Sequence, residues 1–87
     1  MSNYVYILRE KQTLESGEVS VYLKGFATED LAESELIKQV DQKIADAMRN
    51  GDGTIFIDDL DGSYAELYDE HGNKWVFSVE PLFIKQA

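Results

Sequence analysis

The sequence has no cysteine, one histidine (His71) and one proline (Pro81) among its 87 residues. Without thiols the chain forms no disulfide and no thiolate zinc site, and a single histidine cannot supply a histidine cluster. A domain this short buries only about 60–65% of the surface that its unfolded chain exposes, so its core leaves little stability to spare. Good packing and self-association are the means of stabilisation that remain.

Long apolar segments are also missing. The longest apolar runs are three to five residues, which is too short to cross a bilayer. The start of the chain, residues 1–4, has neither the basic segment nor the long apolar segment of a signal peptide. Together with the absence of cysteine, these features predict a cytoplasmic protein with no membrane partner.

Basic residues are scarce: 17 acids against 8 bases give a net charge of −9. A negative field repels nucleic acid and anionic membranes and attracts basic partners. The same charge also serves solubility, so its sign alone does not decide between the two roles. The hydrophobic content of 44% is enough for a folded core.

Two strands are predicted before the middle of the chain. Residues 4–9 (YVYILR) are rich in β-branched and aromatic side chains. Residues 18–26 alternate apolar and polar side chains with the period of a half-buried strand. The polar segment between them contains Gly17 and is expected to be a hairpin turn, so the two strands should pair antiparallel.

A helix is predicted from the residues after Thr28 to about Asn50. Thr28 is suited to an N-cap, the acids after it suit the positive end of the helix dipole, and Gly51 suits a left-handed C-cap. One apolar stripe follows the three- and four-residue spacing of a helix; it consists of Leu36, Ile37, Val40, Ile44, Ala47 and Met48.

Three further strands are predicted at residues 54–57, 63–68 and 74–79. Residues 58–63 are expected to form a turn in which Gly62 takes a positive φ, and residues 69–73 a hairpin loop with a glycine bulge. Pro81 cannot donate a ladder hydrogen bond, so it marks an edge, a bulge or a chain exit. The order β-β-α-β-β-β predicts one α+β domain over residues 1–87, an antiparallel sheet of four to five strands with one helix packed on one face.

No combination of residues indicates catalysis. His71 lies in a polar turn (DEHGN), and carboxylate pairs need a deep cleft that a chain of this size rarely provides. The segment around Gly62 resembles part of a calcium loop, but Ile57 and Tyr68 stand where the first and twelfth ligands belong. We therefore expect no enzyme activity, no cofactor and no metal.

The acids of the second half form the strongest signal in the sequence. Between Arg49 and Lys74 there is no lysine or arginine, but there are seven acids: Asp52, Asp58, Asp59, Asp61, Glu66, Asp69 and Glu70. A surface of one sign attracts a basic protein surface. The leading hypothesis is a small acidic protein-interaction module that binds such a surface or self-associates. The alternatives are a structural, housekeeping homodimer and an inhibitor that mimics nucleic acid, of the kind that phages encode.

A second candidate for self-association is the apolar triplet Leu82, Phe83 and Ile84 near the C-terminus. Three adjacent residues of a strand cannot all face one way, so part of the triplet has to meet something other than one sheet face. The same segment of a second subunit would satisfy it, which makes a homodimer a candidate partner arrangement.

The first 40 residues or so carry a resemblance. The segment YVYIL, residues 4–8, followed by GFATEDLAE, residues 25–33, resembles the opening of many small uncharacterised proteins of bacteria and their phages. In those proteins a strand pair leads into a helix through a phenylalanine and a small cap residue. The resemblance implies a phage or mobile-element setting and assigns no site residue.

Overall fold

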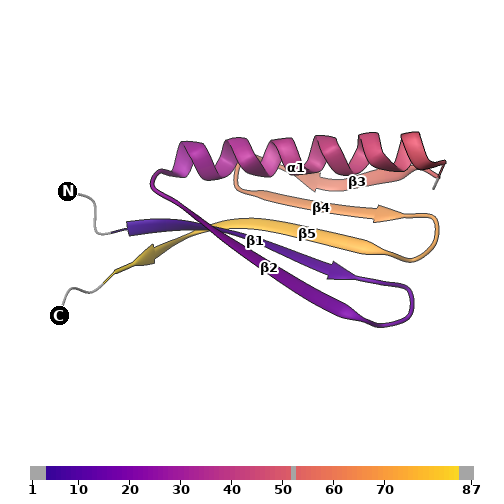
Figure 1. Cartoon of the computed structure of the whole chain (residues 1–87), viewed down its shortest axis with the longest axis horizontal. Coiled ribbons are helices and arrows are strands. Elements are labelled where there is room, and N and C mark those ends of the chain that lie inside the picture. Colours follow the sequence, from indigo (N-terminus) through magenta and orange to yellow (C-terminus); the bar gives the residue numbers. More distant parts are fainter. Residues whose placement is uncertain (1–3, 52, 85–87) are drawn as a thin grey trace.

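The computed structural model describes residues 4–51 and 53–84, which form a five-stranded antiparallel sheet with one helix on one face (Figure 1). Along the chain the elements are β1 (Tyr4–Thr13), β2 (Val19–Phe26), α1 (Glu29–Asn50), β3 (Ile55–Leu60), β4 (Tyr64–Asp69) and β5 (Lys74–Phe83). The predicted α+β class, the order of elements and the antiparallel pairing of the first two strands are confirmed.

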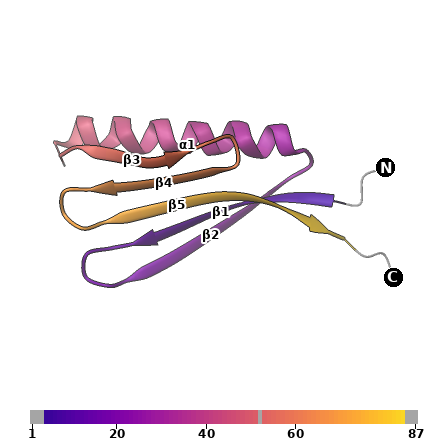
Figure 2. The same ribbon diagram turned by 180° about the vertical axis from the view of Figure 1, so that it is seen from behind.

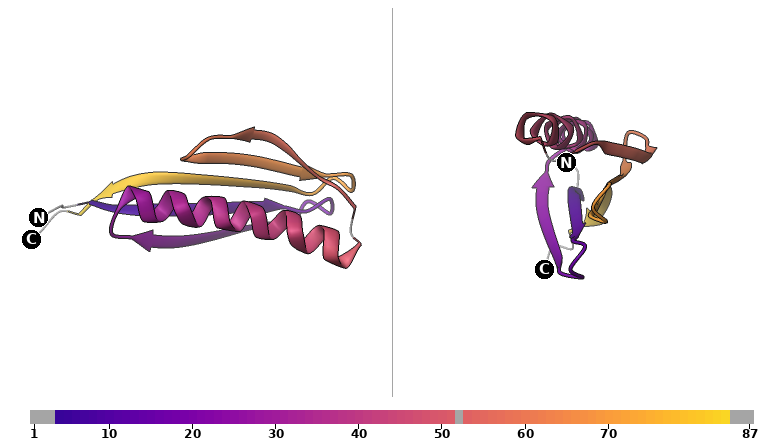
Figure 3. Two further views of the ribbon diagram at one scale, coloured as in Figure 1. Left: turned by 90° about the horizontal axis from the view of Figure 1, so that it is seen from above. Right: turned by 90° about the vertical axis from the view of Figure 1, so that its right-hand side faces the viewer.

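Across the sheet the strand order is β2-β1-β5-β4-β3, so β2 and β3 are its two edges. The molecule is elongated, with extents of 48 × 24 × 19 Å. Seen from behind, β2 is the outermost strand on the side away from α1 (Figure 2). The end-on view shows α1 lying over one face of the twisted sheet, while no helix of the described residues covers the other face (Figure 3).

The caps of α1 match their prediction. Leu31 N donates to Thr28 Oγ1 at 3.2 Å, and Gly51 takes the left-handed conformation with φ of 70°. The helix buries Ala32, Leu36, Val40 and Ala47 against the sheet. The predicted stripe was wrong for Ile37 and Met48, which are exposed. Successive residues are about 100° apart around a helix, so both lie beside the narrow line that meets the sheet.

The core forms where the middle of α1 meets the central strands. Its buried members are Leu8 of β1, Leu36 and Val40 of α1, Ala65 and Leu67 of β4, and Trp75 and Phe77 of β5. Partner residues on neighbouring strands share a face. The pairs Ala65–Phe77 and Leu67–Trp75 therefore define the covered face, and the residues next to them in sequence define the open face.

The strand β3 is longer than predicted, and the expected turn over residues 58–63 is wrong in its first half. Asp59 pairs with Glu66 and Leu60 with Ala65, while the register shifts between Ile57 and Asp59. This shift is a β-bulge that holds the extra residue Asp58, so ladder pairing overrides the low strand preference of aspartate.

The turn itself contains Gly62, whose φ is not positive, contrary to expectation. A Cβ atom at this position would lie 3.3 Å from the Glu33 Oε1 atom, so any larger residue would require the Glu33 side chain to shift slightly. The turn is therefore pressed against the first part of α1.

The strands β1 and β5 also extend further than expected, to Thr13 and Phe83. Pro81 lies inside β5 and pairs with Tyr6. The last β4 partner of β5 is Ser78, and the N–H of Val79 still donates to Ser63 O at 2.8 Å, so beyond Val79 β5 has a neighbouring strand on one side only. Pro81 is tolerated because this part of β5 is locally an edge.

Candidate functional site

The seven acids singled out in the sequence do not gather in one place. Asp61 lies in the β3–β4 turn, and Asp69 and Glu70 lie at the opposite end of β4. Six residues of extended strand separate those ends by roughly 17–20 Å. Glu66 and its partner Asp59 lie between them on the open face, with Asp58 at the bulge. Asp52 lies outside the described residues.

The acids at the β4–β5 turn serve the turn. Asp69 accepts hydrogen bonds from the backbone N–H groups of His71 and Asn73, both at 2.9 Å, and from Asn73 Nδ2 at 2.8 Å. Burial raises the pKa of the Asp69 carboxyl, but these hydrogen bonds outweigh it and hold the pKa below its ordinary value. The neighbouring Glu70 accepts a longer bond of 3.4 Å from Thr54 N. A carboxylate committed to its own turn is a poor contact for a partner.

Glu66 is neutralised on the open face. It forms an ion pair with Lys74 of β5 and accepts a hydrogen bond of 2.9 Å from the Tyr64 hydroxyl. The bonds from Lys74 and Tyr64 lower the pKa of the Glu66 carboxyl, and the pKa values of Lys74 and Tyr64 are raised in return. This part of the open face is a mixed-charge network.

The structure assembles a different group of acids, which we call the acidic corner: Glu29, Asp30 and Glu33 of α1 together with Asp61 of the β3–β4 turn. Burial raises the pKa of the Glu33 carboxyl, and the negative charges of the other three raise it further. Among residues 4–51 and 53–84, the charges that raise the pKa of Glu33 are all negative. Sequence reasoning missed this group because it joins residues about 30 positions apart, and only the spatial order of the strands brings them together.

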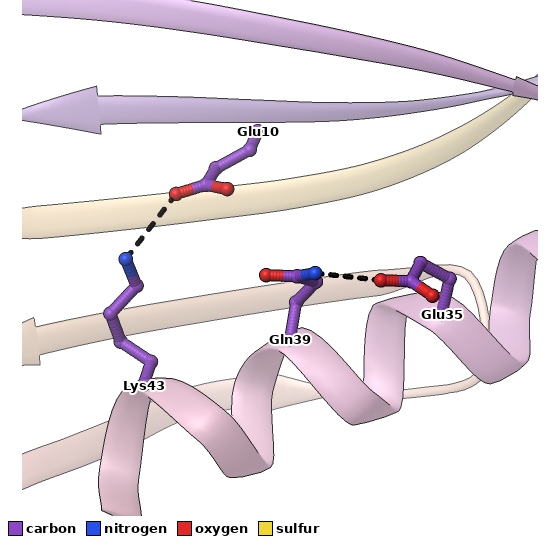
Figure 4. Close-up of polar contacts among 4 residues, drawn as sticks. All are labelled: Glu10, Glu35, Gln39 and Lys43. Carbon is purple, nitrogen blue, oxygen red and sulfur yellow. Dashed lines mark hydrogen bonds and ion pairs between the residues drawn. The ribbon is translucent and has the colours of Figure 1, made fainter. Parts of the chain in front are cut away.

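A groove of about 330 Å³ runs between α1 and the first two strands. It is lined by Leu8, Glu10, Tyr22, Leu23, Lys24, Glu35 and Gln39. Glu10 points from β1 towards α1, where Lys43 Nζ lies 3.5 Å from its carboxylate, and Gln39 donates to Glu35 at 2.6 Å (Figure 4). That bond lowers the pKa of the Glu35 carboxyl. The two carboxylates of the groove, Glu10 and Glu35, thus each have a partner within the chain, which favours a structural role.

A second groove, of about 380 Å³, lies further along the same side of α1. Lys43 and Trp75 line it, and the Lys43 ammonium stands 5.4 Å from the centre of the Trp75 ring, in cation–π geometry. His71 and Asp69 also line it. Trp75 Nε1 is buried without a hydrogen-bond partner within the described residues.

The C-terminal triplet lies at the far end of the β1–β5 pair. Leu82 pairs with Val5, and Phe83 packs edge-on against Tyr4 with ring centres 5.4 Å apart. Leu82, Phe83 and Ile84 are all exposed. Their side chains alternate between the two faces, so the triplet forms no single patch.

Residues 4–51 and 53–84 contain no group of three or more histidines, cysteines, aspartates or glutamates that could hold a metal ion. In the same ranges no helix combines the length and the apolar character that a membrane crossing requires.

Comparison with protein-family models, curated proteins and solved structures gave no match. The resemblance of the first 40 residues to small bacterial and phage proteins therefore stays a prediction.

Proposed function

We propose that this protein is a small interaction module that binds a basic protein surface through its acidic corner. The observation that carries the proposal is the placement of the β3–β4 turn, with Asp61, beside Glu33 in the first part of α1, where Glu29, Asp30 and Asp61 all oppose the charge of Glu33. Lysine or arginine side chains of a partner would relieve this repulsion on contact. The net charge of −9 adds long-range attraction for the same partner.

Two of the acids singled out in the sequence support the choice of this surface. Asp69 and Glu66 already have hydrogen-bonding or ionic partners within the chain. Asp61 of the acidic corner also has a turn role, because its Oδ1 atom accepts from Ser63 N at 2.8 Å. That bond uses one oxygen and leaves the negative charge of the carboxylate in place.

A binding titration with an oligolysine peptide tests the proposal. The variant Glu33→Gln/Asp61→Asn removes two charges from the acidic corner, and the amide oxygen that it introduces in the turn can still accept the bond from Ser63. We expect it to weaken binding roughly three- to tenfold, the range expected for two exposed ion pairs. In the wild-type protein, NMR should show the pKa of Glu33 falling when the peptide binds.

The matched control is Glu15→Gln/Asp41→Asn, which removes two exposed charges elsewhere. It should weaken binding less than about twofold at physiological salt, because distant surface charges are screened. Equal losses for the two double variants would mean that the peptide senses only the net charge, and the acidic corner would then be rejected as a site.

A further inference from the structure

The edge strand β2 exposes an unusual amount of apolar surface. Val19, Val21 and Leu23 are 51%, 47% and 66% exposed on the open face, and Tyr22 is 56% exposed on the other face. Within the described residues no element lies outside β2 (Figure 1). An edge that is long, apolar and uncovered is a template for pairing with another strand.

The β1–β2 turn fixes which backbone groups of β2 point outwards. Gly17 has φ of 91°, its N–H donates to Leu14 O at 2.8 Å, and Leu14 N donates to Glu18 O at 2.9 Å. Leu14 and Glu18 are therefore a hydrogen-bonded pair, and such pairs alternate along an antiparallel ladder. It follows that Val19, Val21 and Leu23 direct their N–H and C=O groups away from β1.

We propose that two copies of this chain pair antiparallel through β2, with the two-fold axis at Val21, and form one continuous ten-stranded sheet. In this register Val21 faces Val21 of the second copy, and Val19 faces Leu23. The outward backbone groups of these residues would form about six hydrogen bonds between the copies. The apolar side chains on the open face would cover one another at the same time.

Charge complementarity favours a second copy as the occupant. The same register places Lys24 opposite Glu18 of the other copy, once on each side of the axis, and both side chains lie on the helix face of the sheet. Residues 4–26 carry three acids and three bases, so this hairpin is neutral although the whole chain carries −9. Two copies therefore approach through β2 with less repulsion than through any acidic surface. The acidic corner contributes no residue to this pairing, so the proposal is independent of the function proposed above.

Sedimentation or light scattering up to about 1 mM protein tests the dimer, a range that detects even weak association. We expect the wild type to reach the mass of a dimer and Val21→Lys to stay monomeric with an unchanged circular dichroism spectrum. Met48→Lys and Leu82→Lys change residues of similar or greater exposure elsewhere and should still dimerise. A monomeric wild type, a dimeric Val21→Lys, or loss of the dimer only in Leu82→Lys would overturn the proposal.

A charge exchange tests the register. Lys24→Glu should weaken the dimer about tenfold, because both ends then bring like charges together, and Glu18→Lys in the same chain should restore it. Failure of the restoration would reject this register.

The absence of cysteine makes cross-linking unambiguous. Val21→Cys should give a covalent dimer with a short bis-maleimide, whereas Met48→Cys should give none. Equal yields from the two variants, or no product from either, would count against pairing at β2 whatever the effect of the substitutions on folding.

Discussion

The strands β2 and β3 are both edges of the same sheet, yet they differ in length, regularity and charge. β2 has eight residues in unbroken register with β1 and contains one charged residue, Lys24. β3 has six residues, a bulge between Ile57 and Asp59, and the consecutive acids Asp58 and Asp59. Shortness, a bulge and charge are the devices that keep an edge strand from pairing. The fold protects β3 with all three and leaves β2 open.

The apolar content of the two edges is similar, which makes this contrast informative. Phe56, Ile57 and Leu60 of β3 are about as exposed as Val19 and Val21 of β2. Phe56 also stacks on Tyr68 of β4, with ring centres 5.2 Å apart. Exposure of apolar side chains therefore does not distinguish the edges, whereas access to the backbone does.

The largest effect should come from removing the protection of β3. Asp58→Thr/Asp59→Val gives the chain two open edges, and a subunit with two such edges can add copies without limit. We expect light scattering to show a mass that grows with concentration far beyond a dimer. Adding Val21→Lys should halt growth at a β3-paired dimer. The charge-matched control Glu15→Gln/Asp41→Asn should not polymerise; polymerisation of that control would show that net charge, and not edge protection, keeps the chain soluble.

The next effect concerns the strands between the two edges. Leu67 of β4 is fully buried, whereas Leu23 of β2 is 66% exposed. Leu67→Ala should lower the free energy of unfolding by about 2–5 kcal/mol, because it leaves a cavity in a close-packed core. In the monomer, Leu23→Ala should change it by less than about 0.5 kcal/mol.

Urea denaturation in the Val21→Lys background measures both leucine variants without any contribution from association. If both variants lowered the free energy of unfolding by a similar amount, Leu23 of β2 would belong to the core and β2 would not be a free edge. Without Val21→Lys and at high protein concentration, Leu23→Ala should lower the free energy of unfolding further, because it also weakens the dimer that stabilises the folded chain.

The contrast between the edges also shows what the sequence could and could not predict. The alternation of Val19, Val21 and Leu23 and the caps Thr28 and Gly51 are local signals, so the elements that they predict are confirmed. The bulge at Asp58 depends on pairing with β4, which no local pattern reports. The approach of Gly62 to Glu33 also depends on how the strands pair, so the sequence could not predict the acidic corner. For the same reason, the acids predicted to form one surface are divided among the β3–β4 turn, the open face and the β4–β5 turn.

That β2 is an unprotected edge could be seen only from the order of the strands in the sheet. The sequence shows an alternating strand, and such a strand could equally lie in the centre of a sheet. Only the order β2-β1-β5-β4-β3 makes it an edge. The sequence did indicate that so short a chain has little stability to spare and that self-association is one way to gain more, and the structure exposes apolar residues of β2 at the surface.

The smallest expected effect concerns the pH dependence of stability, to which Glu66 and Glu33 contribute with opposite signs. Hydrogen bonds from Lys74 and Tyr64 hold the pKa of Glu66 below 4.5, so its stabilisation is present above that pH and is lost as the pH falls through the lowered value. Burial and the neighbouring acids hold the pKa of Glu33 above 4.5, so its ionisation destabilises the fold, and acidification through the raised value relieves this. The two carboxyls thus act in different pH windows with opposite signs.

Urea unfolding from about pH 3 to pH 7 should resolve the two contributions, because the slope of stability against pH counts the protons bound on unfolding. Glu66→Gln should flatten the rise of stability with pH below 4.5, since the charged form is no longer favoured. Glu33→Gln should steepen the rise above 4.5, since a group that opposes it has gone. If Glu33→Gln left the curve parallel to that of the wild type, the like charges of the acidic corner would not be in contact in solution. The negative charges on the β3 side of the sheet would then be evenly spread, with no cluster at the acidic corner.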